Sequence, residues 1–133
     1  MNWYIFSAGI ISIIAFLIHA FVGDKEYKLI LPNNEDESNK KILSWIQGRS
    51  GWHWVSVDLL LSGIVLLLIS ATNYLEAEKT LALLLGIYFL VVGVTWFGTV
   101  LFSKTKNNQI IVLGQWILCF LLSGLIFLGW ASL

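Results

Sequence analysis

Two histidines and three other polar side chains could carry chemistry in this sequence, because they lie in or beside long apolar segments. His19 is near the end of the first apolar segment, and His53 begins the second. Two histidines at matching depth on neighbouring helices could bind a transition metal, or the iron of a haem from both sides. Asp58 or Glu26 could complete a metal shell, and Gln115 adds an amide at a similar depth. These five residues are the candidate polar site.

Asp58 is the only charged residue inside an expected membrane span. A charged side chain at mid-helix costs about 2.5–3.5 kcal/mol in a membrane, so such a carboxylate is usually paired or functional. One hypothesis is that Asp58 lines a pathway for protons or ions. The alternative is a structural hydrogen bond, with His19 as the best partner by depth, that fixes the register of two helices.

The composition indicates that these residues are carried by segments that lie in a membrane. The chain has 133 residues, of which 58% are hydrophobic and 12% charged, and its mean hydropathy is +0.82. An ordinary soluble domain carries about 25% charged residues, so lipid must be the solvent for most of this chain. A soluble enzyme, a nucleic-acid-binding protein and a disordered tail are thereby excluded.

Apolar runs of helical length predict an all-α fold with four membrane spans. A helix needs about 20 residues to cross roughly 30 Å of hydrocarbon, and each run is close to that length. Short connections after the second and third runs make their neighbours antiparallel. We expect one domain, residues 1–133, that forms an antiparallel four-transmembrane-helix bundle. The expected spans are residues 3–22, 54–71, 81–102 and 110–130.

The basic residues predict the orientation of these spans. Seven of the eight Lys and Arg residues lie in the connections 23–53 and 103–109, and Lys79 alone lies in the other connection. By the positive-inside rule, the two basic connections are cytoplasmic and both termini face outward. The expected location is a bacterial inner membrane.

The long first connection contains a helical pattern of its own. Residues 33–39 are strongly polar, whereas Ile42, Trp45 and Ile46 recur at helical spacing between Lys40 and Gly48. This predicts a short amphipathic helix on the inner membrane surface that ends at Gly48. The helix would serve as a membrane anchor or as a docking surface for a partner.

Small residues predict which faces of the first two spans are buried. Ala8, Ser12, Ala15, His19 and Gly23 share one face of the first span. Such a face lets helices approach closely, so His19 should point into the bundle. The second span has a similar stripe at Ser56, Gly63 and Ser70.

A short pattern in the first half of the chain resembles small four-span bacterial membrane proteins. The pattern consists of the segment His19-Ala-Phe-Val-Gly23, then Glu26, Pro32 and the pair Trp52-His53 at the start of the second span. The resemblance implies a four-helix bundle, implies no particular activity, and draws attention to the histidine pair.

Three classes of function remain open. The first is an accessory or scaffold subunit, with the bilayer and a membrane-protein partner or a second copy as its contacts. The second is a metal- or haem-binding membrane protein that uses His19 and His53. The third is a small transporter or channel subunit with Asp58 in its pathway. The first class is preferred because it requires no ligand site, and an enzyme is less expected because no known catalytic motif occurs.

Overall fold

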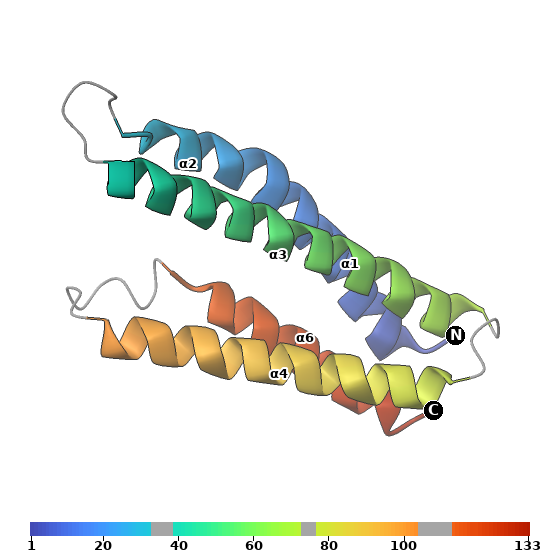
Figure 1. The fold of residues 1–133 in the computed structure, drawn as a ribbon. Helices are drawn as coiled ribbons and strands as arrows, with labels where there is room; N and C mark the ends of the chain where they lie inside the picture. Colours follow the sequence, from blue (N-terminus) through green and yellow to red (C-terminus); the bar gives the residue numbers. More distant parts are fainter. Residues whose placement is uncertain (33–38, 73–76, 104–112) are drawn as a thin grey trace.

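Every described element of the computed structural model is a helix, as the sequence predicts. The structure describes residues 1–32, 39–72, 77–103 and 113–133. Helix α1 (Trp3–Leu17), a π-helical turn η1 (Ile18–Gly23) and α2 (Asp24–Leu29) follow one another without a break (Figure 1). The other helices are α3 (Asn39–Ala71), α4 (Glu78–Phe102) and α6 (Gln115–Trp130).

The helices form two antiparallel pairs. The N-terminal hairpin consists of α1, η1, α2 and α3, and the C-terminal hairpin consists of α4 and α6. The hairpins meet mainly through α1 and α6, whereas α3 and α4 touch only sparsely. Both termini lie at one end of the molecule, and α2 and the start of α3 lie at the other (Figure 1).

Close packing inside the N-terminal hairpin follows the predicted small-residue stripes. A Cβ atom built on Gly9 would lie 3.2 Å from the carbonyl oxygen of Gly63, and the reverse distance is also 3.2 Å. The Ser12 hydroxyl donates a hydrogen bond of 2.7 Å to the buried carbonyl of Leu59. Ala8 and Ser12 are fully buried. The prediction of a buried first-span face is confirmed at these positions.

The C-terminal hairpin uses the same arrangement of small residues against large ones. Gly86 lies against the ring of Phe127, and Gly93 lies against Phe120. The Ser123 hydroxyl donates a hydrogen bond of 2.8 Å to the Gly86 carbonyl. A hydroxyl that bonds a carbonyl of the neighbouring helix satisfies itself without water, as a membrane interior requires.

The two hairpins are joined tightly at the end that carries the termini. Asn2 caps α1, because its side-chain oxygen accepts a hydrogen bond of 3.2 Å from the Ile5 amide. Its side-chain nitrogen donates to the carbonyl of Gly129 on α6 at 2.9 Å. Ile5 is fully buried and packs on Gly129, which has no side chain to obstruct it. One residue therefore caps a helix and bridges the hairpins.

The first connection is more helical than predicted. The helix of the first span continues to Leu29, and α3 runs unbroken from Asn39. The predicted helix at residues 40–48 exists, but its predicted end at Gly48 and its separation from the second span are wrong. Gly48 lies inside α3, where the Tyr27 hydroxyl of α2 occupies the space that a side chain would need. The glycine therefore serves a helix contact and not a helix stop.

Other predicted boundaries fall partly outside the described residues. The polar segment at residues 33–38 and the expected start of the fourth span at residue 110 lie there. Within the described part, α6 begins at Gln115 and has 16 residues.

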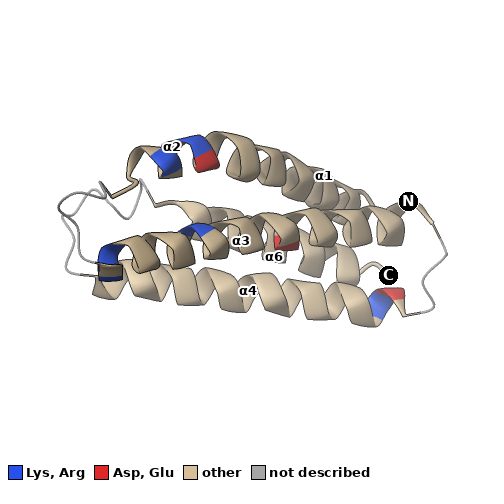
Figure 2. Cartoon of the chain, turned by 45° about the horizontal axis from the view of Figure 1, so that its top comes forward, with Lys and Arg blue, Asp and Glu red and all other residues tan. Residues whose placement is uncertain are grey.

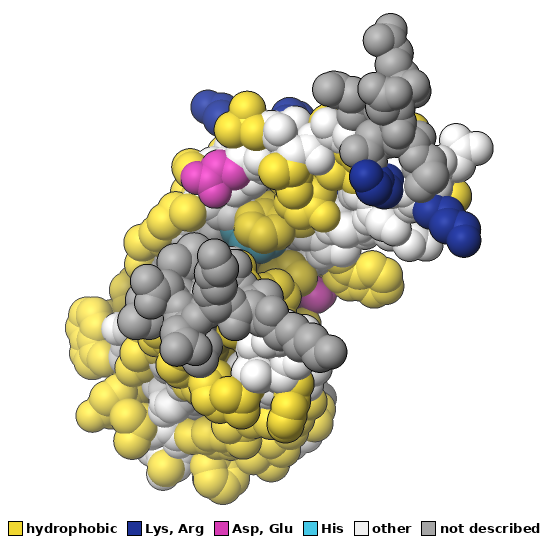
Figure 3. All heavy atoms as spheres, turned by 90° about the vertical axis from the view of Figure 1, so that its left-hand side faces the viewer, with side chains coloured by type: hydrophobic (Ala, Val, Ile, Leu, Met, Phe, Trp, Pro, Cys, Tyr) yellow, Lys and Arg dark blue, Asp and Glu magenta, His cyan; other side chains and the backbone are white. Residues whose placement is uncertain are grey.

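Three of the helices are long and apolar enough to cross a membrane: Trp3–Leu29, Asn39–Ala71 and Glu78–Phe102. The helix α6 is apolar but shorter. Large hydrophobic side chains are exposed on every described helix, and Figure 3 shows many of them, in yellow, in a view onto the end of the molecule away from the termini. Most of the charged residues on the described helices lie in α2, in the first part of α3 and at the start of α4 (Figure 2).

Candidate functional site

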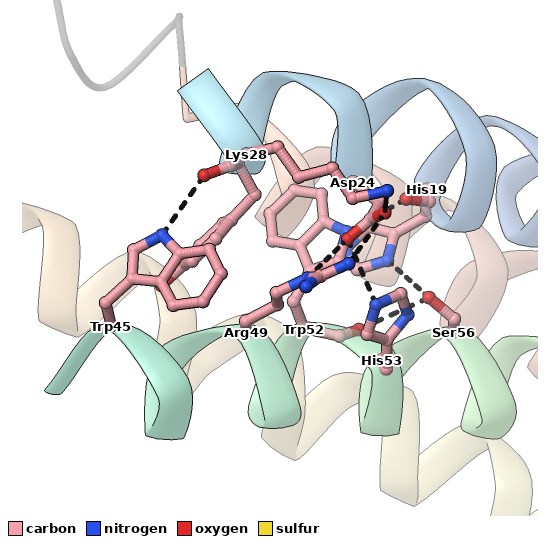
Figure 4. Close-up of polar contacts among 9 residues, drawn as sticks. His19, Asp24, Lys28, Trp45, Arg49, Trp52, His53 and Ser56 are labelled. Atoms are coloured by element: carbon pink, nitrogen blue, oxygen red, sulfur yellow. Dashed lines mark hydrogen bonds and ion pairs between the residues drawn. The ribbon is translucent and has the colours of Figure 1, made fainter. Parts of the chain in front are cut away.

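A π-helical turn places His19 where it contacts α3. Such turns are rare and occur often at functional sites, because they leave a backbone carbonyl free of its usual helical partner. The His19 carbonyl accepts a hydrogen bond of 2.9 Å from the indole nitrogen of Trp52 on α3. The two side-chain rings are stacked, with centroids 3.8 Å apart and planes within 9° (Figure 4). Gly23 leaves room for the Trp52 ring, which a Cβ atom at that position would strike.

The imidazole of His19 is held in one orientation by Ser56. His19 Nδ1 lies 2.9 Å from Ser56 Oγ, and the Ser56 hydroxyl donates to the Trp52 carbonyl at 3.2 Å. A hydroxyl has one hydrogen to donate. When the Ser56 hydroxyl donates to the Trp52 carbonyl, the tautomer of His19 that carries its hydrogen on Nδ1 completes the chain of hydrogen bonds.

A second polar group, the Asp24 cluster, consists of Asp24, Lys28, Arg49 and His53. Arg49 binds both carboxylate oxygens of Asp24, with Nε at 2.8 Å and Nη2 at 3.2 Å. Lys28 Nζ lies 2.8 Å from the same carboxylate, and His53 Nε2 lies 3.1 Å from it. Asp24 is the one buried charged residue in the described part of the chain.

The charges of the Asp24 cluster hold the carboxylate ionised. Asp24 and Arg49 lie beyond the expected spans, which end at residue 22 and begin again at residue 54. Hydrogen bonds from Arg49 and then Lys28 hold the pKa of the Asp24 carboxyl well below its usual range. The same pairing raises the pKa of Arg49. The cluster thus acts as a charged clasp between α2 and α3 (Figure 4).

Aromatic contacts extend this clasp along α2. The Trp45 indole nitrogen donates to the Tyr27 carbonyl at 3.2 Å, and the Arg49 guanidinium lies 5.4 Å from the centre of the Trp45 ring. The Tyr27 ring lies between those of Trp45 and Trp52, at 6.0 Å and 5.9 Å. The face of α3 that was expected to rest on the membrane therefore packs, at Trp45, against α2.

Asp58 is separate from both groups. Its Oδ2 accepts a hydrogen bond of 3.0 Å from the Tyr88 hydroxyl of α4. The expected hydrogen bond between Asp58 and His19 is wrong, because each side chain has a different partner. Asp58 and Tyr88 link α3 to α4 where those helices otherwise touch little.

An apolar cleft separates the two hairpins at the end away from the termini. It consists of two cavities of about 500 Å³ each. The two cavities adjoin, because five residues line both of them, and together they are here called the inter-hairpin cleft. Figure 3 looks onto this end and shows a recess in which a histidine is visible. The shared lining residues are His19, Trp52, Leu59, Gln115 and Leu118.

Two of the predicted site residues meet in this cleft, and a third lies at its rim. His19 and Gln115 line both cavities, and the exposed Glu26 lines one. The Gln115 Oε1 atom is buried, and none of the described residues forms a hydrogen bond with it. His53 belongs instead to the Asp24 cluster. The structure thus distributes the five candidates over three places: the cleft, the clasp and the contact with Tyr88.

The arrangement of the described residues gives the metal hypothesis no support. Nowhere in the described ranges do three His, Cys, Asp or Glu side chains come close enough to hold an ion. His19 Nδ1 and His53 Nε2 are bound to Ser56 and Asp24 respectively.

Sequence reasoning did not select Asp24, Arg49 or Trp52 as site residues. The sequence carried a signal, because Asp24 lies two residues after the first expected span, and Arg49 and Trp52 lie five and two residues before the second. In an antiparallel hairpin these positions share one depth. The chemical complementarity of Asp24 with Arg49 could have been read from that register.

No family model, curated protein or solved structure is found to match this chain. The resemblance to small four-span bacterial membrane proteins therefore stays a prediction, and the functional argument rests on the site itself.

Proposed function

We propose that this chain is an integral protein of a bacterial inner membrane that acts as a non-enzymatic accessory subunit through the inter-hairpin cleft. In this proposal the chain crosses the bilayer four times as an antiparallel bundle. Both termini face outward, and the connections 23–53 and 103–109 are cytoplasmic. The cleft then opens in the cytoplasmic half of the bilayer.

Membrane insertion is supported by the surface and by the placement of charge. Three helices have the length and hydropathy of a span, and large apolar side chains such as Ile14, Ile18 and Leu61 are exposed on them. Water would make such a surface aggregate, whereas lipid solvates it. The termini lie at one end, as an even number of spans requires (Figure 1).

The observation that carries the binding role is the cleft itself. It is largely apolar, and each of its two cavities has the volume of a known ligand site. The ionisable groups of the Asp24 cluster line neither cavity and are engaged with one another. They support a role in holding the shape of the cleft more than a role in proton transfer.

The transporter alternative lacks such support. Asp58 lines neither of the two cavities, and its carboxylate is bound to Tyr88. We therefore do not assign a pathway to it.

Orientation is tested by labelling with a membrane-impermeant maleimide in intact cells. Leu29→Cys and Ala77→Cys place single thiols at exposed positions at opposite ends of the molecule, in a Cys119→Ser background. We expect Ala77→Cys to react in intact cells and Leu29→Cys to react only after lysis. Reaction of both from the same side would contradict the four-span arrangement.

The role of the cleft is tested by photocrosslinking in native membranes. A photoreactive amino acid at Val55 lies in the cleft, and one at Leu61 lies on the same helix but lines neither cavity. We expect a discrete adduct from position 55 and only diffuse lipid labelling from position 61. The same products from both positions would contradict a binding site in the cleft.

A further inference from the structure

We propose that a hollow on the outer side of α3 binds the phosphate of an anionic phospholipid of the cytoplasmic leaflet. The hollow has a volume of about 340 Å³ and is lined by Trp45, Ile46, Arg49, Ser50 and His53. In the described part of the chain it shares no lining residue with the inter-hairpin cleft. The inference goes beyond the role of the cleft, and it rests on the proposed function for the insertion and orientation of the chain.

The hollow adjoins the Asp24 cluster, which has more positive than negative charge. Lys28 and Arg49 both bind the single carboxylate of Asp24. His53 lies 3.1 Å from the same carboxylate, so all three side chains converge on Asp24 (Figure 4). Because two cations share one anion, the cluster keeps one positive charge even when His53 is neutral. An anion in the hollow is therefore attracted to the cluster.

The cations of the cluster have hydrogen-bond donors that Asp24 does not use. A guanidinium has five N–H donors and an ammonium has three. Arg49 directs only Nε and Nη2 at the carboxylate, and its side chain is 31% exposed. It can therefore bind Asp24 on one side and a phosphate oxygen on the other, as a bidentate donor suits. The exposed Ser50 adds a hydroxyl to the same hollow.

The depth of the hollow matches that of phospholipid head groups. The second expected span begins at residue 54, directly after His53. Trp54 is 72% exposed, and exposed tryptophans of membrane proteins concentrate at the headgroup level. In the proposed orientation this level belongs to the cytoplasmic leaflet. A lipid phosphate therefore reaches Arg49 without leaving its usual depth.

An apolar stripe on the same face of α3 leads from the hollow into the expected span. At about 100° per residue, Arg49, Ser50, His53, Val57 and Ile64 fall within about 100° of one another. Val57 and Ile64 are 50% and 43% exposed. A phospholipid can place its phosphate in the hollow and an acyl chain along this stripe. A free phosphate or an acidic protein segment in the cytoplasm would use only the hollow.

The test places a photoreactive amino acid at Val57 of the full-length protein, in nanodiscs of equal parts phosphatidylglycerol and phosphatidylcholine. The control position is Val94 of α4, which is 56% exposed. One positive charge near the membrane surface favours an anionic lipid about fivefold. Mass spectrometry of the adducts should therefore show about five times more phosphatidylglycerol than phosphatidylcholine at position 57, and equal amounts at position 94. The same ratio at both positions would overturn the proposal.

A pair of matched variants tests the hollow itself. Ser50→Glu adds a carboxylate where the lipid phosphate is expected, at an exposed position. The enrichment at position 57 should then disappear. Ser44→Glu makes the same change at an exposed position that does not line the hollow, about 9 Å away along α3 and about 120° around it. It should keep the enrichment. Enrichment that survives Ser50→Glu unchanged would overturn the proposal.

The wild-type comparison of positions 57 and 94 needs no charge variant, so it decides the question even if Ser50→Glu does not assemble. It also separates this inference from the proposed function. Lipid adducts of equal ratio at the two positions would reject the phosphate site and retain membrane insertion. The absence of lipid adducts at both positions would reject insertion itself. A discrete protein adduct at position 57 in native membranes would assign the hollow to a protein partner and overturn the lipid.

Discussion

The two hairpins pack directly against each other at one end of the molecule and are separated by a cleft at the other end. At the end with the termini, Gly129 lets the side chain of Ile5 lie directly on α6, and Asn2 bridges the helices. At the other end, the N-terminal hairpin is clasped by Asp24 and Arg49, and the hairpins are separated by the cleft. Tight packing around small residues thus closes the contact between the hairpins at one end, which we call the closed end. At the other end, the open end, charge pairing and aromatic stacking hold the N-terminal hairpin together, and the two hairpins stay apart.

The largest expected effect on stability comes from replacing a glycine by leucine at the closely packed end, compared with the same replacement at the end with the cleft. Gly129→Leu places atoms where Ile5 lies, and overpacking of this kind costs about 3 kcal/mol of unfolding free energy. Gly51→Leu is made at a position with no atom within 4 Å of an added Cβ, so it should change stability by less than about 1 kcal/mol. Thermal unfolding in detergent, followed by tryptophan fluorescence, measures both. Equal destabilisation by the two variants would refute the contrast between a closed and an open end.

The next effect concerns the charged clasp. Asp24→Asn removes the charge that Arg49, Lys28 and His53 share. It should lower the melting temperature by several degrees, because the buried side chain at position 24 then loses its charged hydrogen bonds to Arg49 and Lys28. Leu29, which is exposed at the end of α2, offers a control substitution to Ala that should have little effect.

The pH dependence of this variant has a definite sign. The folded pKa of Asp24 is depressed, so its stabilisation is present above the unfolded pKa of about 3.9 and is lost as pH falls toward the folded value. The melting temperatures of wild type and Asp24→Asn should therefore stay apart between pH 7 and about 4.5 and converge below about 4. Convergence already near neutral pH would mean that Asp24 is not held ionised by its partners.

A smaller effect is expected at the wall of the cleft. Trp52→Phe keeps a ring over His19 but removes the hydrogen bond to the His19 carbonyl. The free energy of unfolding should fall by about 1 kcal/mol, the usual value for one hydrogen bond. The matched change Trp54→Phe, at an exposed position of α3, should be neutral. If Trp54→Phe were the more damaging of the two, the role assigned to the Trp52 bond would be wrong.

The sequence predicts the closed packing better than the open end, for a physical reason. Small-residue stripes are periodic along one helix, so the burial of Ala8 and Ser12 follows from the sequence alone. The clasp depends on both helices extending past the apolar runs, as far as Leu29 and back to Asn39. Hydropathy cannot show that extension, because charged residues that satisfy one another look the same in sequence as charged residues in water.

Among the residues of the candidate site, the position along the helix was predictable from the sequence, whereas the hydrogen-bond partner was not. The depth of His19 and Gln115 was sufficient to place both at one end of the bundle, and both line the cleft. The partners of His53 and Asp58 depended on rotation about the helix axes. They are Asp24 and Tyr88, which the sequence analysis did not select.

The smallest expected effect tests the link between α3 and α4, midway between the two ends. Tyr88→Phe removes the hydroxyl that donates to Asp58. Because hydrogen bonds between transmembrane helices contribute about 0.6 kcal/mol on average, the free energy of unfolding should fall by only about 0.5 kcal/mol. Tyr4→Phe, at another exposed tyrosine, controls for the loss of a hydroxyl. A loss of more than about 2 kcal/mol from Tyr88→Phe alone would mean that the Asp58–Tyr88 bond holds the hairpins together. The contact of Asn2 and Ile5 with Gly129 would then not be the main contact between the two hairpins, and the contrast between the two ends would fail.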